Sequence, residues 1–137
     1  MARKNVLQNL FGRKLMSEIF YSEDHLWFEE ENKTVKVGIA DNLKNRFSPE
    51  SIQIAEAGTA LGAGSPVVAL ESSKATYEFT TPFACKIVEC NELLQESPSR
   101  ISQQEESLNW LYIAEICDED WNNDLMSYDE YQDYIEP

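Results

Sequence analysis

The chain has 137 residues, of which 42% are hydrophobic, and it includes 3 Trp, 6 Tyr and 6 Phe. This length and composition suit one compact domain and leave little room for a second, substrate-binding domain. With 25 acidic against 11 basic residues the formal net charge is −14, which argues against nucleic-acid binding by phosphate neutralisation, and no apolar run approaches the ~18 residues of a membrane span.

Residues 1–20 differ from the rest of the chain, and we treat them as an N-terminal extension of a domain that covers residues 21–137. They carry four basic side chains, Arg3, Lys4, Arg13 and Lys14, against the single acid Glu18. Their apolar residues fall near helical spacing. Three interpretations stay open: an organelle transit peptide, a short docking helix, or an extension that precedes a natural start at Met16. The first would place the protein in the mitochondrial matrix; otherwise we expect a cytoplasmic protein.

From Tyr21 onward the sequence predicts mostly β structure with short helices. Alternating apolar residues, turn residues and prolines mark the strand ends. Asp41 is predicted to cap a short helix over Asn42–Phe47, which Pro49 would end. Strands are predicted, in chain order, at Leu26–Phe28, Thr34–Ile39, Ser51–Ile54, Pro66–Leu70, Thr76–Thr80, Phe83–Cys90 and Leu108–Ile116.

The three cysteines are Cys85, Cys90 and Cys117. An odd count without CxxC or Cys/His spacing argues against a disulfide framework and against a zinc site. We therefore expect buried, reduced thiols, in keeping with a reducing compartment, and no metal. Because Cys85 and Cys90 are five positions apart in one predicted strand, their side chains should face opposite ways.

The C-terminal part of the chain is strongly acidic. Between Glu115 and Pro137 there are nine acidic residues and no Lys or Arg. Ser127 and Glu130 form a capping box, so a helix is predicted with Tyr128, Tyr131, Tyr134 and Ile135 at helical spacing, packed as a lid on the sheet. The acidic face either steers encounters with basic partner surfaces or serves solubility alone.

Lys74 is the residue on which the functional prediction depends. A short polar break, Ser72–Ala75, separates two strand-like runs, so it reads as a hairpin turn. An apolar strand leads directly into this turn, and the small residues Ser73 and Ala75 leave the amine of Lys74 open on both sides. Glu71 is the only nearby carboxylate before the turn.

These residues resemble a known family. Glu71-Ser72-Ser73-Lys74-Ala75 is similar to the E-S-x-K-A hairpin of the glycine cleavage system H proteins, which are lipoyl carriers. Further motifs follow in the same order over roughly residues 21–136. They are Tyr21–Trp27 (Y-x-x-x-H-E-W in the family), Val37–Asp41 (V-G-I-T-D), Thr81-Pro82 with Glu89-Cys90-Asn91 (S-P … E-V-N), Trp110-Leu111, and the acidic Ser127–Tyr131.

The resemblance implies a mainly β fold, a barrel-sandwich hybrid of the lipoyl/biotinyl-carrier type with short peripheral helices and a C-terminal helix. It implies lipoate joined by an amide to Lys74, with Glu71 recognised by the lipoate-attaching enzyme and Glu78 as a candidate for the cleft that shelters the arm. A biotin carrier would show M-K-M, which is absent. The expected protein is a monomeric, non-catalytic carrier subunit.

The family role is to shuttle the aminomethyl group of glycine between enzymes. The resemblance implies as partners a PLP-dependent glycine decarboxylase, a folate-dependent aminomethyltransferase and a dihydrolipoyl dehydrogenase. The alternative is a diverged relay or redox-linked lipoyl acceptor outside glycine cleavage. A protein that kept the fold but lost the cofactor is a third option, which the intact Glu71 and Lys74 disfavour.

Four positions depart from the family pattern. The cleft glutamate of H-E-W is Leu26, the glycine after S-P-x-S is Cys85, and the family's aspartate after the lysine is Glu78. The stretch 105–110 lacks the proline and glycines of P-Y-G-E-G-W. Attachment needs only the hairpin, whereas protection of the loaded arm needs the cleft, so lipoylation is the safer prediction.

An enzymatic function is disfavoured by the residues themselves. His25 is the only histidine, and beside Trp27 a structural hydrogen-bonding role is expected. A Ser-His-Asp hydrolase would require a nucleophile elbow such as G-x-S-x-G, and the sequence contains none. No catalytic residue is therefore assigned.

Overall fold

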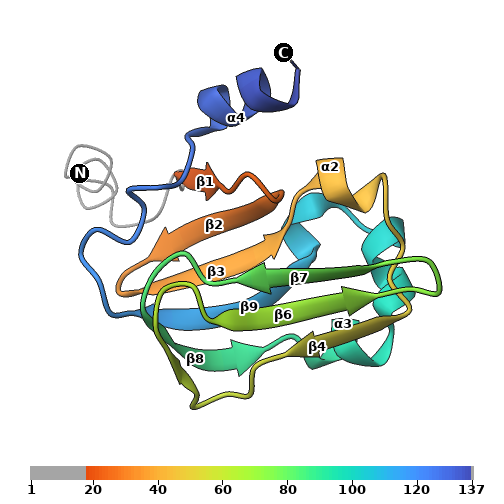
Figure 1. Cartoon of the computed structure of the whole chain (residues 1–137), viewed down its shortest axis with the longest axis horizontal. Coiled ribbons are helices and arrows are strands. Elements are labelled where there is room, and N and C mark those ends of the chain that lie inside the picture. The colour runs from red at the N-terminus through yellow and green to blue at the C-terminus, as the bar shows by residue number, and fades with distance from the viewer. Residues whose placement is uncertain (1–17, 137) are drawn as a thin grey trace, which may run out of the picture.

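Two antiparallel sheets form the domain in the computed structural model, which describes residues 18–136 (Figure 1). The larger sheet has the strand order β1-β2-β3-β9-β8-β5 and the smaller one β4-β6-β7. The strands are β1 (Ile19–Tyr21), β2 (Leu26–Glu31), β3 (Thr34–Ile39), β4 (Ser51–Ile54), β5 (Ala60–Leu61), β6 (Pro66–Glu71), β7 (Thr76–Thr80), β8 (Cys85–Cys90) and β9 (Trp110–Ile116).

Short helices surround the sheets. They are α2 (Asp41–Lys44), α3 (Glu92–Glu96), the 3-10 segments η1 (Pro98–Gln103) and η2 (Glu106–Leu108), and the C-terminal α4 (Tyr128–Ile135). The architecture confirms the predicted fold class, a mainly β sandwich with peripheral helices and a C-terminal helix. No helix among residues 18–136 is long and apolar enough to cross a membrane.

The core lies between the sheets because the strands alternate as the sequence predicts. In β3, Val35, Val37 and Ile39 are buried on one face. From the smaller sheet Leu70 and Phe79 join the same apolar cluster. Each such side chain contributes about 1.5–3 kcal/mol by its removal from water.

The predicted cap of the first helix is wrong. The N-cap residue of α2 is Ala40, whose side chain cannot cap, and Asp41 is the first helical residue. A distant side chain takes over the role, because the backbone N–H of Asp41 donates to Oε2 of Glu106 at 2.7 Å. The helix also ends at Lys44, well before Pro49, and only Leu43 of its residues is buried.

A β-bulge in β8 corrects the prediction for the cysteines. The register between β8 and β9 shifts between Ile87 and Glu89, which breaks the two-residue alternation. Cys90 consequently packs against the same core cluster as the buried Cys85. Cys117 is exposed, contrary to the expected burial, and all three thiols are free.

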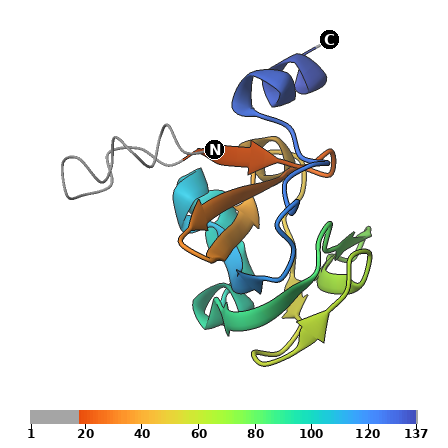
Figure 2. The same cartoon turned by 90° about the vertical axis from the view of Figure 1, so that its left-hand side faces the viewer.

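The C-terminal helix confirms the predicted capping box, and it packs on the larger sheet at its β1 edge. Ser127 and Glu130 make both reciprocal bonds of the box. Tyr131 is buried in an apolar cluster with Tyr21 and Trp27 of the larger sheet, whereas Tyr128 and Tyr134 are 57% and 45% exposed. The helix packs beside the edge strand β1 (Figure 2), next to the point where Tyr21 pairs with Met126.

The predicted extension falls mostly outside the described residues, and so does the helical spacing noted within residues 1–17. Its last two residues, Ile19 and Phe20, belong to β1 and pair with Glu29 and Phe28 of β2.

Candidate functional site

The hairpin between β6 and β7 forms where the sequence predicts it. The strands pair up to Glu71 and Thr76, and the N–H of Ser72 donates to the carbonyl of Ala75 at 2.9 Å. The hydroxyl oxygen of Ser72 accepts the backbone N–H groups of Lys74 at 3.2 Å and Ala75 at 3.3 Å. Ser72 therefore organises the turn from inside, as serine does in such turns.

Lys74 lies at the tip of this turn, with Ser73 and Ala75 on either side, and all three residues are exposed. Figure 1 shows the hairpin projecting beyond the smaller sheet, at the right of the view. Within residues 18–136 the amine makes no ion pair, since the one pair formed there joins Lys44 and Asp41. The side chain is thus open to an enzyme that approaches from solvent.

The stem of the hairpin is held on both sides. Strand β4 pairs with β6 through Ser51 and Glu71, and the N–H of Glu50 donates to the carbonyl of Glu71 at 2.7 Å. Across the hairpin, the ring of Tyr77 lies 4.6 Å from that of Phe47. These contacts make the support of Lys74 stiff.

The two acidic residues predicted to belong to the site, Glu71 and Glu78, lie on one face of the smaller sheet. Glu71 pairs with Thr76, and Glu78 pairs with Ala69, whereas the buried Leu70 and Phe79 fall on the alternate positions. Side chains alternate between faces along a strand, so Glu71 and Glu78 both project from the outer face. Glu78 is exposed and Glu71 partly so.

The departures from the family pattern are accommodated inside the structure. Leu26 is 1% exposed and belongs to the main core cluster, so it offers an arm no surface. Cys85 is also buried, with its sulfur 3.7 Å from Oγ1 of Thr81, and burial raises the pKa of its thiol. Both side chains are packed in the hydrophobic core.

The stretch 105–110 is ordered without the family's glycines and proline. The amide of the buried Asn109 donates to the carbonyl of Ile101 at 3.0 Å and accepts from Nε2 of Gln104 at 2.8 Å. Glu106 caps α2, and burial raises the pKa of its carboxyl, while the N–H of Asp41 acts in the opposite direction.

Two of these polar residues escaped the sequence prediction. The role of Ser72 had a local signal, because serine two positions before a turn residue commonly bonds backbone N–H groups. The role of Glu106 had no local sequence signal, since Glu106 lies 65 positions from the N–H group that its side chain accepts.

His25 has the structural role expected from the sequence. Its Nδ1 lies 2.9 Å from the hydroxyl of Tyr131, which joins the start of β2 to α4. Its φ is +72°. Among the described residues no group of three His, Cys, Asp or Glu could hold a metal ion.

Comparison with known proteins extends these observations to the whole domain. The sequence model of the family "Glycine cleavage H-protein" matches residues 19–137. A glycine cleavage system H protein of Halalkalibacterium halodurans is 31% identical over 122 residues, which cover 88% of this chain and 95% of that protein. One of Staphylococcus epidermidis is 32% identical over 120 residues, covering 87% and 95%.

The fold has a solved counterpart. The crystal structure of a glycine cleavage system H protein from Mycobacterium marinum matches with a TM-score of 0.74 and 23% identity, and the match covers 90% of this chain and 100% of that one. By fold, by the family match and by relatives that align over nearly their whole length, this chain belongs to the glycine cleavage H-protein family.

Proposed function

We propose that this protein is a non-catalytic lipoyl carrier of the glycine cleavage system, with lipoate joined by an amide to Nζ of Lys74. The observation that carries the proposal is the exposed amine at the tip of a hairpin whose stem is held by β4 and by the contact of Phe47 with Tyr77. Such a tip presents the lysine to an attaching enzyme in a fixed geometry. Glu71, on the outer face beside it, is the acidic group that this enzyme would recognise, and Glu78 on the same face is the candidate for the cleft that shelters the arm.

Attachment converts the lysine into a long arm. Amide formation removes the positive charge of Lys74 and adds a dithiolane. About ten bonds of ~1.5 Å along a zigzag give a reach of roughly 12–15 Å. The arm can therefore enter the active site of a partner while the domain stays outside, which gives the disulfide a high effective concentration there.

The chemistry at the end of the arm belongs to the partners. In the family role, the oxidised disulfide accepts an aminomethyl group from a PLP-dependent glycine decarboxylase, and a folate-dependent aminomethyltransferase unloads it. A dihydrolipoyl dehydrogenase then reoxidises the dithiol by thiol–disulfide exchange. We place this cycle in the cytoplasm, as expected from the sequence, with the protein acting as a monomer.

Intact-mass spectrometry tests the attachment. The protein is incubated with a lipoate-attaching enzyme, lipoate and ATP, beside the Lys74→Ala variant and a matched Lys86→Ala variant, in which another exposed lysine is removed. We expect a mass gain of one lipoyl group in the wild type and in Lys86→Ala, and none in Lys74→Ala. An unmodified wild type, or a modified Lys74→Ala, contradicts the proposal.

A second candidate function is a lipoyl relay or redox-linked acceptor outside glycine cleavage. The observation in its favour is Leu26, which is buried in the core where the family has the cleft glutamate. An apolar side chain at this position supplies no hydrogen-bond acceptor for an amine. Glycine–bicarbonate exchange with a reconstituted decarboxylase separates the two candidates: activity of the lipoylated protein supports glycine cleavage, and its absence supports the relay.

A further inference from the structure

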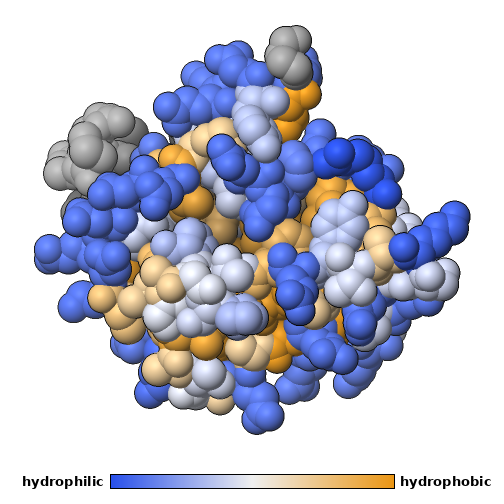
Figure 3. All heavy atoms as spheres, in the orientation of Figure 1, coloured by the Kyte–Doolittle hydropathy of each residue, from blue (hydrophilic) through white to orange (hydrophobic). Residues whose placement is uncertain are grey.

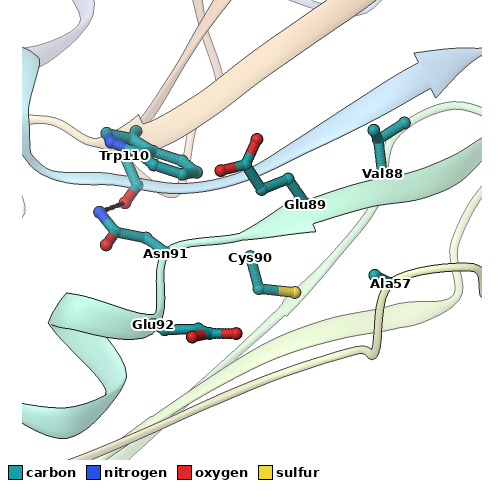
Figure 4. A pocket seen from close by; sticks show the side chains of 7 residues that line it. All are labelled: Ala57, Val88, Glu89, Cys90, Asn91, Glu92 and Trp110. Atoms are coloured by element: carbon teal, nitrogen blue, oxygen red, sulfur yellow. Dashed lines mark hydrogen bonds between the residues drawn. The ribbon is translucent and has the colours of Figure 1, made fainter.

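A hollow of about 460 Å³ opens at the end of β8, in the larger sheet and not in the hairpin sheet. It lies where β8 ends, α3 begins and β9 begins, and Figure 4 shows the side chains around it. Its volume is many times the ~30 Å³ that one water molecule occupies in the liquid. The hollow can therefore admit a whole side chain.

One residue fixes the walls of this hollow. The side-chain amide of Asn91 donates to the carbonyl of Trp110 at 2.8 Å, and its oxygen accepts the backbone N–H of Leu94 at 3.3 Å. Asn91 thus joins the start of β9 to the first turn of α3. These two bonds hold the β9 side and the α3 side of the hollow together.

The β-bulge in β8 gives the hollow its rim. Because the register shifts between Ile87 and Glu89, both Val88 and Glu89 project outward, and Val88 is 51% exposed. Bulges commonly redirect side chains beside functional sites, and exposed apolar residues around a hollow are typical of a surface that a partner covers.

The lining is acidic and aromatic. Figure 4 shows the carboxylate of Glu89 on the side of the Trp110 ring and that of Glu92 across the hollow, below Cys90. No ion pair forms at either carboxylate within residues 18–136. Burial raises the pKa of Cys90, and Glu92, Glu56 and Glu89 raise it further, while a backbone hydrogen bond lowers it.

The ring of Trp110 already attracts one cation. Nζ of Lys36 lies 5.8 Å from the ring centroid, within the range of a cation–π contact. Lys36 does not line the hollow, and the lining contains no basic residue. The lining thus combines one aromatic residue, Trp110, with the carboxylates of Glu89 and Glu92.

We propose that this hollow is a docking pocket for an arginine side chain of a partner protein, held between the Trp110 ring and the carboxylates of Glu89 and Glu92. A guanidinium is planar, stacks flat on an aromatic ring and binds carboxylates in a bidentate manner, whereas an ammonium acts as a point charge. The apolar rim at Val88 would pack against the partner around that arginine. This inference goes beyond the carrier function and does not depend on Lys74.

Peptide binding to the full chain tests the pocket. The probe is the acetylated, amidated tetrapeptide Gly-Arg-Leu-Gly, and the control probes carry Gln or Lys in place of Arg. We expect the Arg peptide to shift the indole N–H resonance of Trp110 saturably and to leave those of the buried Trp27 and Trp121 in place. It should also slow the alkylation of Cys90 by iodoacetamide at least threefold without protecting the exposed Cys117.

Matched variants separate the pocket from general attraction to an acidic protein. Glu89→Gln with Glu92→Gln should weaken binding of the Arg peptide at least fivefold. Glu50→Gln with Glu136→Gln makes the same charge change at exposed sites elsewhere and should leave binding unchanged. Equal weakening in both double variants, equal binding of the three peptides, or no shift of Trp110 overturns the proposal. Lipoylation of Lys74 is measured separately, so failure of either proposal is recognised by itself.

Discussion

Gly38 is a position where the fold tolerates no side chain. A Cβ there would lie 2.3 Å from Cζ2 of Trp27 and 2.6 Å from the carbonyl oxygen of Asn109. Trp27 is buried and its strand is paired with that of Gly38, so the indole cannot simply move away. In this chain the glycine of the family-like Val37-Gly38-Ile39 motif is therefore required by the packing of Trp27 against it.

The first prediction follows from that contact. We expect Gly38→Ala to lower the free energy of unfolding by about 1–3 kcal/mol, the usual cost of overpacking a core. Gly62→Ala is the matched control, because a Cβ at Gly62 meets nothing within 4 Å. Urea denaturation followed by tryptophan fluorescence measures both, and equal stability of the two variants contradicts the packing explanation.

His25 makes stability depend on pH. Burial lowers its pKa below 6.5, Arg46 lowers it further, and Asp24 opposes both. Tyr131 contacts the imidazole at Nδ1. Between the lowered folded pKa and pH 6.5 the unfolded chain therefore binds more protons at His25 than the folded chain does. The contribution of His25 to stability is present above that pH and is lost as the pH falls toward the folded pKa.

The second prediction isolates this contribution. Asn tolerates a positive φ, so His25→Asn keeps the backbone at φ +72° and removes the titration. We expect the free energy of unfolding of the wild type to fall more steeply between pH 7 and pH 5.5 than that of His25→Asn. Parallel curves for the two proteins would show that His25 does not titrate differently on folding.

Among the secondary-structure elements, the β6–β7 hairpin depends on hydrogen bonds between residues within its own turn. Ser72 accepts the backbone N–H groups of both Lys74 and Ala75. We expect Ser72→Ala to slow the initial rate of lipoyl attachment severalfold, because losing hydrogen bonds worth about 0.5–1.5 kcal/mol each loosens the turn. Ser73→Ala removes a neighbouring exposed hydroxyl and should react at the wild-type rate. An unchanged rate in Ser72→Ala contradicts a role for turn geometry.

The difference between local and long-range contacts explains which features the sequence could predict and which it could not. The hairpin, the alternation of buried and exposed residues in β3 and the capping box at Ser127 each depend on residues that are close together in the chain. The cap of α2 comes from Glu106 in a distant loop, and the bulge in β8 comes from its register against β9. Tertiary pairing decides such features, and a single sequence carries little trace of it.

At the scale of the whole molecule, charge is the dominant feature. The formal net charge is −14, and hydrophilic residues cover most of the periphery of the face in Figure 3. Such a charge keeps a protein soluble but destabilises the compact state by self-repulsion. The same field favours encounters with basic partner surfaces.

Salt should therefore stabilise the fold. Raising NaCl from about 10 mM to about 150 mM shortens the Debye length from about 30 Å to about 8 Å. We expect the midpoint of thermal unfolding to rise by about 2–5 °C over this range, which corresponds to roughly 1 kcal/mol. The rise should level off near 150 mM, as screening does, and a flat or falling midpoint contradicts dominant self-repulsion.

The pairing of Tyr21 with Met126 has a practical consequence for handling the protein. It brings the end of β1 and the segment before α4 to one edge of the larger sheet, whereas the hairpin tip projects from a different side of the molecule (Figure 1). A solid support or fluorescent label attached through the C-terminus would leave the lysine free to swing. Immobilised in this way, the domain could meet one enzyme after another in a flow cell.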